Sequence, residues 1–344
     1  MPPHGISLTF WKHMSKTKAK TIAVIACFAL IAVIAVLGVE VYRLDAEDAD
    51  RAVNTEQKTG NRWKMEYNGE EHKVESFVET YLLVGTDNAD GGSSDVHIKN
   101  FYNHTQADFI ALLAVDEEYG KVTAVQINRD TMTDVPWLDV LGRYGGTIFR
   151  QIALAYNSGS GGTDSLKNTA GAVSRLLFGL PVDHSVAFTM AGINTLNDLV
   201  GGVTVHIEDD LTPVDSTLKK GSIVTLHGQQ AEHFLRASMA LRDDTNTARM
   251  ARHREYINGF FESAKKAMDA EPEMFVHAAD TLSPYMVTEM STDELLHLCD
   301  RIQKYGIDSI QTADGELKMG EYYEFYPDMD SLWSIVREVF HISE

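Results

Sequence analysis

The chain is short of cysteine and of positive charge, and both shortages exclude classes of protein. Its 344 residues include two cysteines, Cys27 and Cys299, whose placement fits neither a disulfide framework nor a C-x-x-C metal site. Lys and Arg number 30 against 50 Asp and Glu, for a formal net charge of -20. Proteins that grip nucleic acid need a basic face that displaces phosphate counterions. We therefore expect no nucleic-acid partner and no cysteine-based metal site.

One long apolar segment lies near the N-terminus. Thr21 to Val39 carries no charge and, at ~1.5 Å per residue, is long enough to cross a ~30 Å hydrocarbon core. Four lysines precede it, which predicts a cytoplasmic N-terminus and an extracytoplasmic remainder. A cleavable signal peptide is the alternative, but no clear small-x-small cleavage site follows the segment. The sequence thus favours a single-pass protein of the cell membrane.

The chain divides into four predicted regions. Residues 1–20 form a cytoplasmic N-terminus, 21–42 a transmembrane signal anchor, 43–73 a polar and partly helical juxtamembrane linker, and 74–344 an extracytoplasmic domain. Residues 1–42 contain four of the Lys and one of the Glu, so the outer part keeps 26 Lys and Arg against 49 Asp and Glu. Any basic cluster in that part therefore stands against an acidic background.

The outer domain alternates two hydrophobic periods. Apolar runs typical of strands alternate with amphipathic runs typical of helices, which predicts an α/β sandwich around one sheet. No internal repeat or low-complexity segment interrupts this pattern. The predicted strands are 78–87, 107–116, 121–128, 183–190, 203–209, 308–314 and 322–327, and the predicted helices are 164–180, 191–202, 227–239, 246–270, 292–306 and 329–340.

Charged residues collect at the ends of these elements. Asp87 follows the first long strand, Asp108 opens the second, and Arg129 with Asp130 closes the third. Three arginines lie on the two helices after residue 228, and two of them share a helix face at a spacing of three. Each alone is more often a turn residue or a surface ion pair. Together, two carboxylates and several guanidinium groups can hold a divalent cation and a phosphate. The three helical arginines are Arg236, Arg249 and Arg252.

The order of the motifs resembles the LytR-CpsA-Psr (LCP) family. The motifs are "GTD" after a strand, an Asp that opens the next strand, "RDT" closing the third, then "GGVTV", L-x-G-x-Q-A and R-x-x-R. The similarity runs from about Phe77 to Phe260 and is most continuous in "GLPVDHSVAFTMAGINTLNDLVGGVTV". The N-terminal anchor fits the same family.

This resemblance implies a fold and an activity. It implies a three-layer α/β/α fold around a central mixed sheet, with a long apolar pocket for a prenyl chain. It also implies transfer of a glycopolymer from a polyprenyl-pyrophosphate carrier to peptidoglycan, with Mg²⁺ or Mn²⁺ as cofactor. By position, the resemblance assigns magnesium-associated carboxylates to Asp87 and Asp108, a catalytic pair to Arg129 and Asp130, and pyrophosphate binding to Arg236, Arg249 and Arg252.

Three apolar segments are candidates for the lining of such a pocket. They are "AVSRLLFGL" (172–180), "FTMAGI" (188–193) and "INGFF" (257–261). Ordinary core packing is the alternative for each of their residues.

The chain departs from the family pattern at four positions. Gln106 stands where an Arg is usual, Gln151 where a Lys is usual, Ser238 at the second Arg of R-x-R, and Asn246 at an acidic residue. Arg150 or Arg242 is a candidate to compensate. Fewer cations imply weaker pyrophosphate binding or a different substrate. Two alternatives follow, a polyprenyl-phosphate-binding protein without catalysis, and a transcriptional attenuator, against which the acidic charge and outward topology argue.

An inserted loop carries histidines near the expected site. His97, His104 and Asp95 lie in or beside residues 88–105. A transition metal is one hypothesis for them, but their spacing fits no standard site. We favour solvated loop histidines.

Overall fold

The computed structural model describes residues 64–342, except 75–77, 88–102, 104, 140, 238–245, 271–280, 306 and 321. The predicted anchor, most of the predicted linker and the histidine loop lie outside these residues, apart from the loop positions 103 and 105. Within the described part of the chain, none of the helices is both long enough and apolar enough to span a membrane.

A six-stranded mixed sheet forms the centre of the molecule. Its strand order is β11-β8-β3-β4-β5-β12. Strand β3 runs antiparallel to β4 and parallel to β8, while β5 runs antiparallel to β4 and parallel to β12. This confirms the predicted mixed sheet. The strands are β3 Val78–Thr86, β4 Ala107–Asp116, β5 Lys121–Ile127, β8 His184–Thr189, β11 Met286–Thr288 and β12 Ser309–Gln311.

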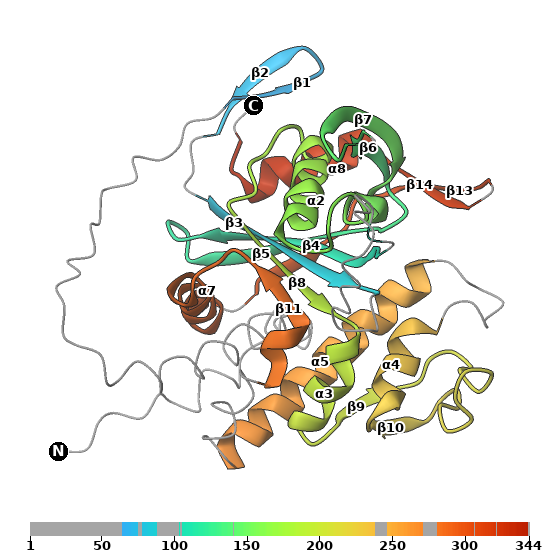
Figure 1. The fold of residues 1–344 in the computed structure, drawn as a ribbon. Helices are drawn as coiled ribbons and strands as arrows, with labels where there is room; N and C mark the ends of the chain where they lie inside the picture. The colour runs from blue at the N-terminus through green and yellow to red at the C-terminus, as the bar shows by residue number, and fades with distance from the viewer. Residues whose placement is uncertain are drawn as a thin grey trace, which may run out of the picture.

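Helices cover both faces of this sheet. Successive side chains of a strand point to opposite faces, so Tyr81 and Leu83 of β3 enter one hydrophobic core and Leu82 and Val84 the other. Burial on both faces explains why the central strands are almost continuously apolar. Figure 1 shows the resulting layers. One face carries α3 Ala191–Leu199, α4 Gln229–Arg236, α5 Asn246–Ala270 and α7 Thr292–Tyr305; the other carries α2 Thr163–Leu176 and α8 Met329–Val339.

Four two-stranded hairpins surround the layers. They are β1–β2 (Lys64–Tyr67, Glu70–Lys73), β6–β7 (Met132–Leu138, Tyr144–Gln151), β9–β10 (Val203–His206, Ile223–Leu226) and β13–β14 (Gly315–Met319, Tyr323–Pro327). Short 3-10 turns, η2 Ile152–Ala155 and η3 Ser283–Tyr285, complete the described elements.

The first hairpin corrects the predicted linker. Residues 64–73 were expected to be polar linker with some helix, but they form β1 and β2. Asn68 and Gly69 have φ of 52° and 80°, the left-handed pair that a two-residue hairpin turn requires. Met65 is buried, and the Tyr67 ring stacks on Trp333 at 4.7 Å. The Tyr67 contact attaches the hairpin to α8, and Met65 joins the hydrophobic core on that face of the sheet.

The tail beyond residue 270 belongs to the same layers. Strands β11 and β12 are the two edges of the central sheet, α7 packs on one face, and α8 packs on the other. The tail therefore closes the sheet at both sides.

A buried ionic cluster attaches α7 to the sheet. Glu79 of β3 lies 2.9 Å from Nε2 of His184 and accepts a 2.6 Å hydrogen bond from Nη1 of Arg301. The same Arg301 nitrogen donates to the Tyr81 hydroxyl at 2.7 Å. Burial by itself would raise the pKa of Glu79, but the His184 hydrogen bond and the Arg301 charge hold it at about 2. The ionised form of Glu79 thus stabilises the fold.

We expect Glu79→Gln to lower the free energy of unfolding by about 2 kcal/mol at pH 7, since it removes the charge from a buried pair. The folded pKa of about 2 lies below the reference value of 4.5. The contribution of Glu79 is therefore complete above pH 4.5 and is lost as the pH falls toward 2. Urea unfolding of both proteins between pH 7 and pH 3 should show their stabilities converging. Glu289→Gln, which affects an exposed ion pair with Lys167, serves as the control and should change stability by less than about 1 kcal/mol.

Candidate active site

The turn after β5 presents Arg129 and Asp130, and hydrogen bonds within the turn and from two other segments hold it. Within the turn, Oδ1 of Asn128 accepts from the Asp130 nitrogen at 3.0 Å. The Arg129 carbonyl accepts from the nitrogen of Ala153 at 3.1 Å, and the Asp130 carbonyl accepts from the nitrogen of Phe325 at 2.8 Å. Since η2 and β14 both hold its backbone, the turn is rigidly placed at the end of the sheet.

The Arg129 side chain lies against Asp108 and Gln106. Its Nη1 donates to Oδ1 of Asp108, and its Nη2 donates to Oε1 of Gln106. Its Nε lies 3.6 Å from Oδ1 of Asp130. The guanidinium plane is therefore oriented by three oxygen atoms from two neighbouring strand ends.

Asp108 also engages a second arginine. Nη1 of Arg249, on α5, lies 3.4 Å from Oδ2 of Asp108. Burial lowers the pKa of Arg249, and the Asp108 charge opposes that effect. Burial raises the pKa of Asp130, and the charges of Arg129 and Arg249 partly offset the rise. The carboxylates and guanidinium groups thus act on one another as a single cluster.

Asp87 joins this cluster from the end of β3. Its Oδ1 accepts from the Gln106 nitrogen at 2.7 Å, and its own nitrogen donates to the Gln106 carbonyl at 3.2 Å. Burial and the nearby Asp108 charge raise the pKa of Asp87, whereas the Gln106 hydrogen bond and the charges of Arg129 and Arg236 lower it. The net shift is upward. A carboxylate with a raised pKa is suited to accept a proton.

The other two predicted arginines differ in their roles. Arg236 ends α4, pairs with Glu232 at 2.9 Å, and is close enough to act electrostatically on Asp87. Arg252 donates from Nε to the Phe234 carbonyl at 3.2 Å and from Nη2 to the Ala237 carbonyl. Its Nη1 lies 3.1 Å from a carboxylate oxygen of Asp209. Arg252 therefore binds the C-terminal end of α4, where cations stabilise a helix, while the other six predicted residues, Asp108 among them, form one cluster.

Two of the four departures from the family pattern have a described side-chain role. Gln106 orients Arg129 by accepting a hydrogen bond from it. An arginine at position 106 could not do this, because a guanidinium group has no acceptor atom. Gln151 donates from Nε2 to the Tyr323 carbonyl at 2.6 Å and so ties β7 to β14. Ser238 and Arg242 lie outside the described residues, and for Asn246 only the backbone is described. Compensation by Arg150 stays a prediction.

An apolar pocket lies between the sheet and helices α3, α4 and α5. Two of the predicted segments contribute to it, 188–193 and 257–261. The third, 172–180, is wrong as a lining, because α2 packs on the opposite face of the sheet. The lining residues are Gly85, Phe109, Phe188, Met190, Ile193, Leu196, Leu235, His253, Tyr256 and Ile257.

His253 is a pocket residue that the sequence did not reveal. Burial, with the charges of Arg249 and Arg252, lowers the pKa of His253 to about 3. The ring is therefore neutral at physiological pH, and it lies 5.9 Å from the Phe109 ring. Neutral imidazole can line an apolar pocket without the cost of a buried charge.

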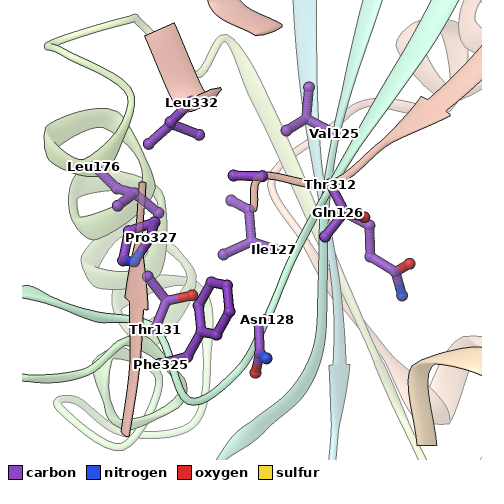
Figure 2. A pocket seen from close by; sticks show the side chains of 11 residues that line it. Val125, Gln126, Ile127, Asn128, Thr131, Leu176, Thr312, Phe325, Pro327 and Leu332 are labelled. Atoms are coloured by element: carbon purple, nitrogen blue, oxygen red, sulfur yellow. The ribbon is translucent and has the colours of Figure 1, made fainter. Parts of the chain in front are cut away.

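A smaller space of about 280 Å³ lies behind the Arg129–Asp130 turn. Figure 2 shows Asn128 and Thr131 at one end of it, with Leu176 of α2 and Leu332 of α8 on its far side. Phe325 of β14 covers this space and also supplies the hydrogen bond to Asp130. The β13–β14 hairpin thus holds the backbone of the Arg129–Asp130 turn in place.

The cluster suits a metal that arrives with phosphate. Within residues 64–342 as described, no group of three or more His, Cys, Asp and Glu is placed to hold a metal ion. Asp87 and Asp108 supply two carboxylates, and Mg²⁺ commonly takes one or two carboxylates together with substrate phosphates. The residues present therefore fit Mg²⁺ or Mn²⁺ shared with a phosphate ligand.

Comparisons with known proteins identify the family of the chain. The model of the LytR_cpsA_psr family matches residues 42–337. The chain is 25% identical over 289 residues to the polyisoprenyl-teichoic acid–peptidoglycan teichoic acid transferase TagU of Enterococcus faecalis, covering 82% of each chain. Its fold resembles Lin1025 of Listeria innocua (25% identity, TM-score 0.51, 77% and 99% coverage of the two chains) and TagT bound to LI-WTA (18%, 0.56, 77% and 90%).

We expect Gln106→Leu to weaken the binding of inorganic pyrophosphate with Mg²⁺ about tenfold, since a hydrogen bond to a charged group contributes ~1.5–3 kcal/mol. Loss of the amide acceptor frees Arg129 to leave its present orientation. Isothermal titration calorimetry of the two proteins measures the difference. Gln126→Leu is the matched control, because Gln126 accepts from Nη1 of Arg254 at 3.0 Å outside the Asp108 cluster. Equal affinities for wild type and Gln106→Leu would contradict the orienting role.

Proposed function

The chain belongs to the LytR-CpsA-Psr family, and we propose that it is an extracytoplasmic phosphotransferase that moves a glycopolymer from a polyprenyl-pyrophosphate carrier to peptidoglycan. One observation carries this proposal. Helix α5 places Arg249 in the charged cluster and His253, Tyr256 and Ile257 in the wall of the apolar pocket. These positions follow Arg249 by four, seven and eight residues, so all lie on one helix face.

A shared helix face favours an amphiphilic ligand. The pocket residues of α5 lie ~6–12 Å along the helix axis from Arg249, at ~1.5 Å per residue. A ligand that fills both parts has an anionic head beside Arg129 and Arg249 and an apolar tail against Tyr256 and Ile257. A prenyl pyrophosphate has this composition, and paired guanidinium groups match phosphate oxygens well.

The proposed reaction replaces the phosphoanhydride bond of a pyrophosphate with a phosphodiester bond. The oxygen of an acceptor sugar hydroxyl attacks the phosphorus that carries the glycopolymer, a new P–O bond forms, and the bond to the bridging pyrophosphate oxygen breaks. Polyprenyl phosphate leaves, and the hydroxyl proton passes to a carboxylate. Asp130 is the candidate, because burial raises its pKa and the resemblance does not assign it to the metal.

Charge neutralisation is the main demand of this reaction. Arg129 and Arg249 would face the phosphate oxygens, and Asp108 holds both guanidinium groups in place. Bound Mg²⁺ or Mn²⁺ would neutralise further phosphate charge, with Asp87 and Asp108 as its protein ligands. The names of the E. faecalis relative and of TagT bound to LI-WTA support a teichoic-acid-like donor. The predicted N-terminal anchor would place the site at the extracytoplasmic surface of the cell membrane.

A binding protein without turnover is the second candidate. Gln106 and Gln151 stand where the family usually has cations, which favours weaker stabilisation of the transition state. This candidate predicts co-purified prenyl phosphate and no transfer to any acceptor. Mass spectrometry of lipid extracted from the purified chain, followed by a transfer assay, separates the two.

We expect Arg129→Ala to reduce transfer by at least about 10³-fold, because the variant loses a preorganised cation at the reacting phosphate. The assay uses the full chain, a polyprenyl-pyrophosphate-linked sugar, a peptidoglycan acceptor and Mg²⁺. Arg254→Ala, on the same face of the sheet but paired with Gln126, should retain activity. Circular dichroism checks that both variants are folded, and unchanged transfer by Arg129→Ala would refute the site assignment.

Metal removal gives a separate expectation. Chelation by EDTA should abolish transfer, and added Mg²⁺ or Mn²⁺ should restore it. Asp87→Asn should raise the Mg²⁺ concentration for half-maximal rate about tenfold, since an amide is a weaker ligand than a carboxylate. Asp139→Asn is the control, because Asp139 also accepts from backbone nitrogens but lies in the exposed β6–β7 turn. Full activity in EDTA would contradict a metal-assisted reaction.

A further inference from the structure

Two hairpins beside the site expose aromatic rings. The Phe149 side chain of β7 is 56% exposed and lies 6.5 Å, centroid to centroid, from the ring of Tyr326 on β14, at 37° between planes. Tyr144, at the start of β7, is 65% exposed. We call these three rings the aromatic platform. Phe149 and Tyr144 are exposed and Tyr326 is half-buried, and neighbouring exposed apolar groups often mark a binding surface.

The platform is built on one face of the β6–β7 hairpin. In the strand register Phe149 lies opposite Asp134, and Tyr144 lies opposite Leu138. Positions that differ by two along a strand share a face, so Asp134 and Leu138 point to the same side. The register shifts between Trp137 and Leu138 and leaves Gly145 without an opposite residue, so Phe149 and Tyr144, although five residues apart, lie opposite residues of one side, as successive contacts for an elongated ligand.

Hydrogen bonds connect the platform to the Arg129–Asp130 turn. Phe325, which precedes Tyr326, donates to the Asp130 carbonyl at 2.8 Å and bridges to Thr131. Gln151, two residues after Phe149, donates to the Tyr323 carbonyl. At ~3.3 Å per residue, the platform thus begins within ~10 Å of the turn. Figure 1 shows the β6–β7 and β13–β14 hairpins side by side.

Charged groups border the rings. Nζ of Lys318 lies 4.6 Å from the Tyr326 centroid and 3.2 Å from a carboxylate oxygen of Glu316. The Tyr326 hydroxyl donates to Glu324 at 2.7 Å. These charges make insertion into hydrocarbon costly, and the two carboxylates oppose an anionic polymer. A neutral sugar fits both features, because its C–H face packs on an aromatic ring and its hydroxyl groups bond to the charged border.

We propose that the aromatic platform binds the acceptor glycan, a neutral N-acetylated hexosamine chain, and directs one of its hydroxyl groups toward the phosphate held by Arg129. This assignment rests on the proposed transferase function and adds to it the place of the acceptor. The donor lipid and its pyrophosphate occupy the pocket and cluster, so an acceptor that reaches the same phosphorus must approach from the rim. The platform is a binding surface on that rim.

The test compares Phe149→Ala, Phe149→Trp and Tyr119→Ala in the full chain, with chitotetraose as the probe. Tyr119 is the matched control, an exposed aromatic residue at the far end of β4 and β5. Phe149→Ala should raise both the Kd for chitotetraose and the acceptor KM about fivefold, with the donor KM unchanged. Phe149→Trp, which keeps an aromatic ring, and Tyr119→Ala should both leave the Kd for chitotetraose and the acceptor KM at the wild-type level.

Direct binding and transfer separate the two proposals. If wild type transfers and Phe149→Ala keeps the wild-type acceptor KM and Kd, the platform is overturned and the transferase function stands. If wild type binds chitotetraose in a Phe149-dependent way but transfers nothing, the transferase proposal fails and the glycan surface stands. If Phe149→Ala changes the sedimentation coefficient but leaves the affinity for chitotetraose unchanged, the rings contact a second copy of the chain. That result would overturn the proposal.

Discussion

The pairing of one carboxylate, Asp108, with two arginines is the interaction on which the site depends. Arg129 lies at the end of β5 and Arg249 lies on α5. Their like charges repel unless an anion lies between them. Asp108 supplies that anion at a fixed point of β4. A buried arrangement of this kind costs desolvation, so it persists only where rigid surroundings hold it. The three-layer fold, with both sheet faces covered, provides such surroundings.

Helix α5 converts that charged cluster into a site for an amphiphile. Its first turns carry Arg249, and the next turns carry His253, Tyr256 and Ile257 into the apolar pocket. The neutral state of His253 matters at the boundary, because a protonated ring there would add a third buried cation beside Arg249 and Arg252. The low pKa of His253 and the apolar lining of the pocket therefore have the same cause, which is burial.

The sequence predicted the central elements and most of the cluster, and it missed what depends on long-range or exposed contacts. Strands β3, β4 and β5 were found because burial on both faces makes them apolar throughout. Strand β7 was missed, since "YGGTIFRQ" is mostly exposed and lacks alternation. The support of Asp130 by Phe325 joins residues 195 positions apart, so no local pattern announces it. The missing cation at position 106 can be read from the sequence, but spacing cannot show that the Gln106 amide accepts from Arg129.

The glutamine at position 106 also changes the charge balance of the site. Within the described part of the chain, the cluster joins the carboxylates of Asp87, Asp108 and Asp130 to the guanidinium groups of Arg129, Arg236 and Arg249. These three negative and three positive groups balance, and Glu232, which pairs with Arg236 at 2.9 Å, adds a further negative charge; an arginine at position 106 would add one positive charge. A cluster without net positive charge attracts pyrophosphate weakly by itself, so we expect a divalent cation to supply the attraction. Donor binding and metal binding should therefore be strongly coupled in this chain, each raising the affinity for the other by the same factor.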